Sequence, residues 1–181
     1  DRGKLVPGMR PSGMPPVPVH GPDLNKLPYV ERDGAKEFHL IAEPVRREFL
    51  PNLVMDVWGF NGTMPGPIIE ANEGDRVRVI VENRLPEPTS IHWHGLLLAG
   101  VMDGAPGFNG FVAIEPNATY TYRFRLRQSG TYWYHSHSSS QEQAGMYGAI
   151  VIAPARPETT TFARVSVVLL SDHRRESSQA I

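Results

Sequence analysis

Short stretches in which apolar and polar residues alternate dominate the chain after its first third. In residues 76–83 three valines occupy every second position, Val77, Val79 and Val81, and Arg76 and Arg78 take alternate positions on the other face. Residues 119–127 repeat this pattern, with threonine and arginine between four larger apolar residues: Tyr120, Tyr122, Phe124 and Leu126. Because successive side chains of a strand point to opposite faces, both segments are predicted to be half-buried strands.

Further runs of this kind are bounded by glycine, proline or asparagine and are also predicted to be strands: residues 38–44, 54–60, 67–72, 130–137 and 147–153. No segment longer than about ten residues combines helical periodicity with capping residues. About eight short strands at this spacing predict an all-β protein, a Greek-key β-sandwich. The strand at 130–137 follows the previous one after a Ser-Gly turn, which suggests that the two are antiparallel neighbours.

Composition along the chain predicts three parts. Residues 1–35 are rich in proline, which disfavours helices and sheet ladders, and are expected to form an extended arm. Residues 36–154 hold the predicted sandwich. Residues 155–181 comprise a linker and a strand-like run, RVSVVLLSD, which has no evident partner in the sequence that remains. We therefore expect this run to begin a second domain and the chain to be a piece of a larger protein.

The overall composition narrows the classes of function. The 181 residues are 40% hydrophobic and 20% charged, and the net charge is −1. This balance argues against nucleic acid or an anionic membrane surface as a general partner, and no apolar run is long enough to span a membrane. The chain has no cysteine, so any metal must be held by imidazole, carboxylate, carbonyl or thioether groups.

Two His-x-His pairs are the strongest chemical signal in the sequence. His92 and His94 lie in IHWHG, and His135 and His137 lie in YWYHSH. On a strand, this spacing directs both imidazoles of a pair to one face. Two such strands side by side would bring four imidazoles together, and burying them without a partner would be costly. The pattern predicts a metal site, although imidazole suits zinc, copper, iron and nickel alike.

The sequence around these pairs resembles that of a known protein family. The segments WGFNGTMPGPIIEANEGDRVRVIVENRLPEPTSIHWHG, MDGAPG and YRFRLRQSGTYWYHSHSSSQEQAGMYGAIVI are similar to the N-terminal cupredoxin domain of multicopper oxidases, above all the bacterial laccase-like and copper-resistance oxidases. The resemblance covers roughly residues 54–152. It implies a cupredoxin-like fold and a periplasmic or secreted protein. It also implies that dioxygen is reduced to water at a trinuclear copper cluster, which eight histidines hold between the first and last cupredoxin domains.

The resemblance also implies a role for individual residues. By position, His92 matches a ligand of the type 2 copper, His94 and His135 match ligands of one type 3 copper, and His137 matches a ligand of the other. Asp103 in MDGAPG matches an acid near the type 2 copper, where a carboxylate can orient water and pass protons. The alternative is that Asp103 only forms a turn, since Asp-Gly is a common turn dipeptide.

Other polar and aromatic residues near the motifs receive simpler interpretations. Glu142, five residues after the second pair, is interpreted as a solvated loop charge rather than a group beside the metal. The isolated histidines, His20, His39 and His173, are interpreted as surface or capped residues. Three aromatic neighbours of the proposed ligands are interpreted as packing residues: Trp93, Trp133 and Tyr134.

The sequence departs from the family in two respects. A type 1 copper needs a cysteine ligand, and the chain has neither a cysteine nor two further His-x-His motifs. We therefore expect the chain to be inactive alone and to need a C-terminal cupredoxin domain, on the missing part of the chain or on another chain. The reducing substrate, whether a phenol, cuprous ion or another metal ion, stays open.

Two other functions fit the same residues. The chain could be a non-catalytic copper-binding or storage module that uses the four histidines without turnover. It could also be a cupin, which would bind one iron or manganese ion through His135, His137 and Glu142.

Overall fold

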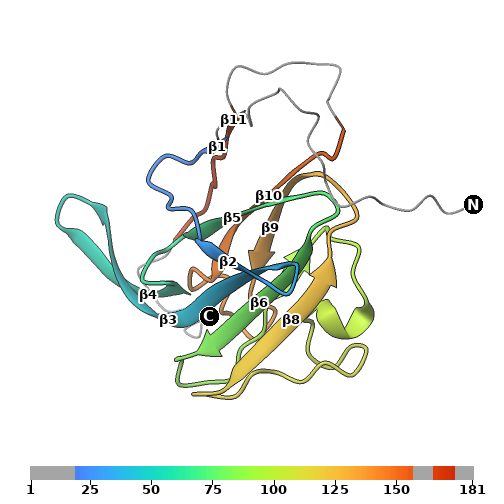
Figure 1. Ribbon diagram of the computed structural model, residues 1–181. Helices are drawn as coiled ribbons and strands as arrows, with labels where there is room; N and C mark the ends of the chain where they lie inside the picture. Colours follow the sequence, from blue (N-terminus) through green and yellow to red (C-terminus); the bar gives the residue numbers. More distant parts are fainter. Residues whose placement is uncertain (1–18, 157–164, 174–181) are drawn as a thin grey trace, which may run out of the picture.

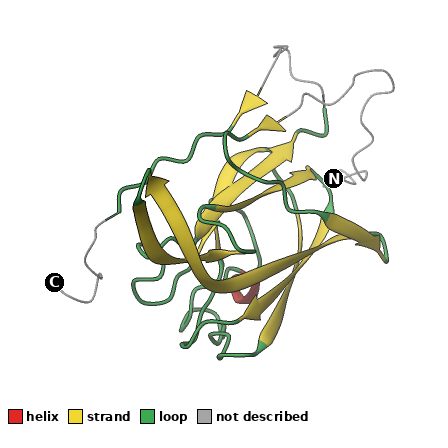
Figure 2. Ribbon diagram, turned by 90° about the vertical axis from the view of Figure 1, so that its left-hand side faces the viewer, coloured by secondary structure: helices red, strands yellow, loops and turns green. Residues whose placement is uncertain are grey.

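The computed structural model of the protein describes residues 19–156 and 165–173. Most of the predicted arm, the middle of the predicted linker and residues 174–181 lie outside this part of the chain. The strands are β1 (Val19–His20), β2 (Tyr29–Arg32), β3 (Ala35–Leu50), β4 (Leu53–Phe60), β5 (Gly66–Asn72), β6 (Arg76–Asn83), β7 (His92–His94), β8 (Thr119–Arg125), β9 (Gly130–His135), β10 (Tyr147–Ala153) and β11 (Val165–Ser166). The prediction of an all-β protein is confirmed (Figure 2).

Nine of the strands form two facing sheets, and β1 and β11 form a separate two-stranded sheet. One has the order β5-β10-β9-β7, and the other has the order β2-β3-β6-β8 with β4 paired to β3 (Figure 1). The connections β4–β5, β6–β7 and β8–β9 each pass from one sheet to the other, as in a Greek-key sandwich. The helical segment of the described residues, η1 (Gly100–Met102), is a single turn, and no described helix is long and apolar enough to cross a membrane.

The core lies between the sheets, on the faces that the alternation predicts. Val77, Val79 and Val81 of β6 are buried, and they belong to one cluster with Trp93 of β7 and Tyr122 of β8. Each large apolar side chain buried here contributes about 1.5–3 kcal/mol to folding. Because the inner face of β7 and β9 is anchored in this core, the alternate residues of these two strands must lie on the opposite face of their sheet.

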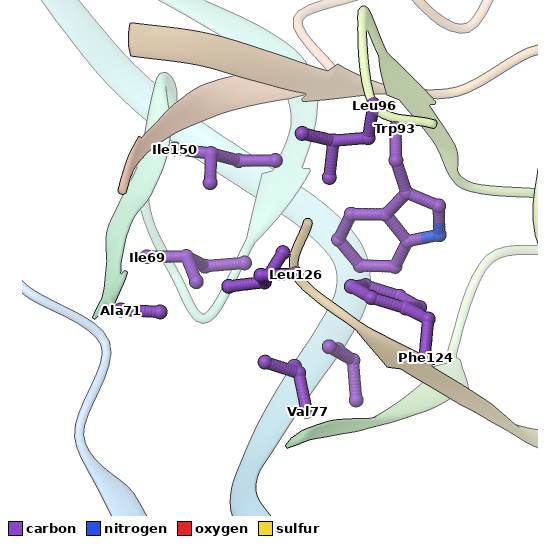
Figure 3. A pocket seen from close by; sticks show the side chains of 9 residues that line it. Ile69, Ala71, Val77, Trp93, Leu96, Phe124, Leu126 and Ile150 are labelled. Atoms are coloured by element: carbon purple, nitrogen blue, oxygen red, sulfur yellow. The ribbon is translucent and has the colours of Figure 1, made fainter. Parts of the chain in front are cut away.

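A small void remains inside the core next to Trp93 (Figure 3). Only apolar side chains line it: Ile69, Ala71, Val77, Val79, Trp93, Leu96, Phe124, Leu126 and Ile150. The indole nitrogen of Trp93 points away from the void in this view. A bound water needs two to four polar partners, so this void is a packing feature and not a binding site.

The prediction that residues 119–127 and 130–137 form neighbouring antiparallel strands is wrong. Strand β8 pairs with β6, whereas β9 lies between β7 and β10 in the other sheet. Leu126, just after β8, is buried at 3% exposure. The chain therefore crosses the edge of the core between the two strands, and a crossing of this kind leaves the same alternation in the sequence as a hairpin.

Strand β3 is longer than predicted and pairs on both sides. Its first half lies parallel to β6, and its second half forms a hairpin with β4 that projects from the sandwich (Figure 1). Pro44, opposite Trp58, is tolerated because the pairing with β6 ends at Ala42, which leaves that side of the strand free.

The predicted boundary at residue 35 does not coincide with the edge of the sheet. Tyr29–Arg32, inside the predicted arm but after its last proline, forms β2 and pairs with the start of β3. Val165–Ser166 also has a partner, since β11 pairs in parallel with β1. Val167 then packs against Ile68 and Ala149, so this run covers the outside of the sheet that contains β5 and β10.

Candidate metal centre

The two histidine pairs come from neighbouring strands, as their spacing predicts. Strand β7 is antiparallel to β9, with His92 opposite His135 and His94 opposite Trp133. The residues between them, Trp93 and Tyr134, point into the core and are almost completely buried. Alternation therefore places the three histidines on the outer face of the sheet, at its β7 edge.

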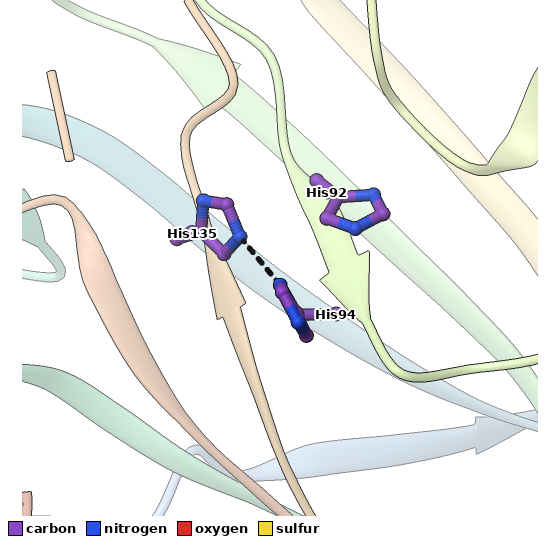
Figure 4. Close-up of side chains that lie close together, drawn as sticks. All are labelled: His92, His94 and His135. Carbon is purple, nitrogen blue, oxygen red and sulfur yellow. Dashed lines mark hydrogen bonds between the residues drawn. The ribbon is translucent and has the colours of Figure 1, made fainter. Parts of the chain in front are cut away.

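The imidazoles of His92, His94 and His135 lie close together (Figure 4). One nitrogen of each ring lies within 4.8 Å of the others. The Nδ1 atom of His94 and the Nε2 atom of His135 are 3.2 Å apart. Two imidazole nitrogens bound to one tetrahedral metal at about 2.0–2.1 Å would be about 3.3 Å apart, so the observed spacing fits a shared metal ion.

Backbone acceptors orient two of these rings. The Nδ1 atom of His92 is 2.9 Å from the carbonyl oxygen of Asp103, and that of His135 is 2.8 Å from the carbonyl oxygen of Ser136. Since a carbonyl can only accept, each Nδ1 carries the proton and each Nε2 has a free lone pair for a metal. Burial lowers the pKa of His135, which favours the neutral imidazole that binds metals.

His137 lies beside this group but outside it. It follows β9, is exposed, and its ring centroid is 5.6 Å from that of His92 and 6.1 Å from that of His135. Its backbone N–H donates to the hydroxyl of Ser90, 3.2 Å away. The structure thus brings three of the four predicted histidines into one cluster and leaves the fourth ring at its side.

Asp103 lies next to His92 and also forms a turn. Its carboxylate is 3.4 Å from Nδ1 of His92, behind the closer carbonyl contact. It ends η1 and is followed by Gly104, which has a φ of +79° and lies so close to the backbone of Ile91 that a side chain there would overlap it. The structure thus places Asp103 both at a bend of the backbone and beside His92, and its role near a type 2 copper stays a prediction.

Glu142 is not the isolated solvated charge that we predicted. Its carboxylate lies 3.1 Å from Nδ1 of His135, although the side chain is 40% exposed. This contact is at the nitrogen remote from His94, so Glu142 does not share a ligand position with the cluster. The cupin alternative, in which Glu142 binds the same ion as His135, does not fit this arrangement.

A buried glutamine, which the sequence analysis missed, joins the loops that carry the histidines. Gln141 is 1% exposed and makes four side-chain hydrogen bonds. Its oxygen accepts from Thr89 and Ser136, and its amide group donates to Glu87 and to the carbonyl of Pro88. A polar residue in a Ser- and Gln-rich loop carries no signal of burial in the sequence, so only the fold could place it.

The remaining residues have mainly structural contacts. Trp93 and Tyr134 pack in the core as predicted, and Trp133 packs in a second apolar cluster. His39 is exposed, 3.7 Å from Glu37. His173 is not isolated, since its Nε2 atom is 3.0 Å from the hydroxyl of Tyr147.

Comparison with known proteins identifies relatives of this site. Residues 42–157 match the family model described as multicopper oxidase. Copper resistance protein A of Escherichia coli is 51% identical over 121 residues, which cover 67% of this chain and 20% of that protein. Its homologue from Pseudomonas syringae pv. tomato is 54% identical over 112 residues, or 62% of this chain and 19% of that protein. The chain thus spans about a fifth of the length of these curated relatives.

Solved structures show the same fold. The multi-copper oxidase from Pseudomonas thermotolerans superposes with a TM-score of 0.65 at 38% identity, over 68% of this chain and 30% of that chain. The multicopper oxidase from Campylobacter jejuni, described as a metallo-oxidase, gives a TM-score of 0.66 at 30% identity, over 84% and 33%. The cupredoxin-like class predicted for the sandwich is therefore confirmed.

Proposed function

The chain belongs to the multicopper oxidase family, and from this premise we propose that it supplies half of the histidine ligands of a trinuclear copper cluster. The observation that carries the proposal is the pairing of His92 with His135 across β7 and β9, with His94 in the same cluster. Three imidazoles at one sheet edge, spaced for metal bonds, are a set of donors that suits copper in both oxidation states.

Each histidine then has a distinct role. His92 would bind the type 2 copper, His94 and His135 would share one type 3 copper, and His137 would bind the other. The 3.2 Å spacing of the His94 and His135 nitrogens supports a shared ion, and the position of His137 outside the cluster supports a separate one. Copper, when bound, would supply the electron transfer by which dioxygen is reduced to water.

We propose that Asp103 delivers the protons that oxygen reduction consumes. Its carboxylate is near His92 and is 35% exposed, so it can exchange protons with solvent and hold one close to the type 2 position. The carbonyl of the same residue keeps the proton of His92 on Nδ1. One residue would thus both orient a ligand and carry protons.

The other half of the site is proposed to come from a C-terminal cupredoxin domain. His94 and His137 are exposed, so both rings are accessible to a partner domain, and the chain spans about a fifth of the length of its curated relatives. A type 1 copper must also lie elsewhere, since this chain has no cysteine. We propose that residues 36–154 act as the first cupredoxin domain, in the periplasm or outside the cell, and that the chain is inactive alone.

Copper content and oxygen consumption test this proposal. The chain is measured alone and together with a C-terminal cupredoxin domain that carries the missing His-x-His motifs, by metal analysis and with a phenol or cuprous ion as reductant. We expect oxygen consumption only in the combined sample. Sustained oxygen consumption by the chain alone would contradict the proposal, and tight copper binding without turnover in either sample would favour the storage function.

Ligand variants identify the residues responsible. His94→Ala and His135→Ala should each lower the copper content, because each removes one of two donors to a shared ion. His39→Ala is the matched control, since His39 is exposed on another strand. Equal copper content in all variants would remove the assignment of these ligands.

A further inference from the structure

The two histidines that face each other across β7 and β9 have matching surroundings. Nδ1 of His92 lies 2.9 Å from the carbonyl of Asp103 and 3.4 Å from its carboxylate. Nδ1 of His135 lies 2.8 Å from the carbonyl of Ser136 and 3.1 Å from the carboxylate of Glu142. Each ring therefore has one carbonyl and one carboxylate on the side remote from the proposed copper.

The loop that carries Glu142 is held in place by buried contacts. The neighbouring Gln141 is almost completely buried, and its side chain binds both the loop before β7 and Ser136. The backbone N–H of Met146 donates to the carbonyl of Gln141 at 3.1 Å, and the carbonyl of Met146 accepts from Ser136 at 3.0 Å. The anchored loop therefore fixes the backbone position from which the Glu142 side chain reaches His135.

No basic partner accounts for the position of Glu142. Within the part of the chain that the structure describes, its carboxylate forms no ion pair with lysine or arginine, and His135 is its ionic contact. Most of the other salt bridges join carboxylates to arginine or lysine, for example Arg84 to Glu82 and Lys26 to Glu70. Glu142 differs from these residues in being directed at an imidazole of the cluster.

We propose that Glu142 is a positioning residue, whose carboxylate shares the Nδ1–H donor of His135 with the carbonyl of Ser136 and keeps Nε2 directed at the copper. This inference rests on the proposed function. A carboxylate behind a metal-bound imidazole fixes the ring and its tautomer and makes the ligand nitrogen more basic. Loss of such a partner weakens metal binding about 10–100-fold.

Two variants and one control test the proposal. Glu142→Gln keeps the shape and a weaker acceptor but removes the charge, and Glu142→Ala removes the acceptor. Glu115→Gln is the control, because Glu115 is an exposed loop carboxylate that forms no ion pair with a histidine in the part of the chain that the structure describes. The exposure of Glu142 makes all three variants compatible with folding, which far-ultraviolet circular dichroism checks.

The first measurement is the nitrogen spectrum of the metal-free chain. Long-range proton–nitrogen correlation of the labelled histidines reports the tautomer of each ring and the shift of its N–H proton. We expect the Nδ1 proton of His135 to move upfield in Glu142→Gln and further in Glu142→Ala, and to stay unchanged in Glu115→Gln. A merely structural role of Glu142 would not move this proton.

The second measurement is copper affinity, by competition with a chelator, in whichever sample of the chain holds copper. We expect binding to weaken about 10-fold in Glu142→Gln and more in Glu142→Ala. An unchanged Nδ1 proton, or an affinity within about twofold of wild type in both variants, would overturn this proposal alone. A wild-type chain that binds no copper in any sample would overturn the proposed function as well.

Discussion

The indole of Trp133 stacks on the imidazole of His135, with ring centroids 4.1 Å apart and planes inclined by 25°. The same indole lies 5.0 Å from the ring of His94. Trp133 also packs against a second apolar cluster, which includes Val45 and Tyr147. One side chain thus joins the histidine site to the packing of the β3–β4 hairpin and β10.

Replacing Trp133 should therefore affect stability and metal binding together. Trp133→Ala is expected to lower the free energy of unfolding by about 2–4 kcal/mol, slightly less than the loss for a fully buried aromatic residue. It should also weaken copper binding, because the rings of His94 and His135 lose the surface that restrains them. Urea unfolding and copper titration measure the two effects.

Trp133→Phe provides the control for this prediction. Phenylalanine keeps an aromatic face against His135 and fills most of the volume, so a loss of about 1 kcal/mol or less is expected. If Trp133→Ala bound copper as tightly as wild type while losing stability, the stacking would have no part in ordering the site.

Tyr122 supports the site from inside the core. Its hydroxyl accepts a hydrogen bond from the backbone N–H of Ile91, 3.0 Å away, directly before His92. Burial raises the pKa of Tyr122, so the phenol stays protonated. Tyr122→Phe should lower the free energy of unfolding by about 1–3 kcal/mol, because the buried N–H loses its acceptor. Thermal and urea unfolding measure this loss.

Tyr132→Phe is the matched control for that substitution. The hydroxyl of Tyr132 donates to the carbonyl of Ser129 at a partly buried position, where water can replace the lost bond. Its loss should be below about 1 kcal/mol. Equal losses of unfolding free energy for the two variants would show that the hydrogen bond from Ile91 to Tyr122 stabilises the fold no more than the bond from Tyr132 to Ser129.

The parts of the fold that the sequence predicted correctly share a local cause. Alternation along β6 and β8 reports which face is buried, because each residue points to one side or the other of its own strand. The burial of Val79 and of Tyr122 follows from that rule. The neighbourhood of the two His-x-His pairs was predictable for the same reason, since both pairs needed only adjacent strands to meet.

The parts that the sequence did not predict depend on which strands become neighbours. The sequence between β8 and β9 does not indicate that the chain crosses to the other sheet, since a short connection can either turn back as a hairpin or make such a crossing. The contact of Glu142 with His135 and the burial of Gln141 arise from a loop that folds back onto β9. These contacts join residues whose side chains would be solvated in any isolated segment.

Acid should weaken one surface network in a defined range of pH. The hydrogen bond from Arg78 holds the pKa of Glu37 below its ordinary value of 4.5, against the opposing effect of burial. Because the folded pKa is lowered, the contribution of Glu37 to stability is present above the unfolded pKa. It is lost as the pH falls through the folded pKa.

Glu37→Gln tests this dependence. The variant should be less stable than wild type near neutral pH, since Arg78 would keep only a neutral acceptor at a position 2.8 Å away. The difference in unfolding free energy should shrink in acid, as the pH falls below the unfolded pKa and through the lowered pKa of Glu37 in the folded protein. A difference that stays constant from neutral to acidic pH would show that charge at Glu37 does not stabilise the fold.

Gly104 closely approaches the backbone of Ile91, directly before His92. Gly104 has a φ of +79°, and a Cβ atom there would overlap the carbonyl of Ile91. Gly104→Ala combines an unfavourable backbone conformation with this overlap and should cost about 2–5 kcal/mol. The variant should also bind copper more weakly, because the carbonyl of Asp103 would move away from Nδ1 of His92.

Gly107→Ala separates the two causes. Gly107 has nearly the same φ, +80°, but no atom lies within 4 Å of a Cβ atom built there. It should therefore lose about 1–2 kcal/mol from backbone strain alone and bind copper like wild type. If Gly104→Ala lost no more stability than Gly107→Ala and kept its copper affinity, the turn would not hold His92. The orientation of that ring would then depend on its contacts with the other histidines.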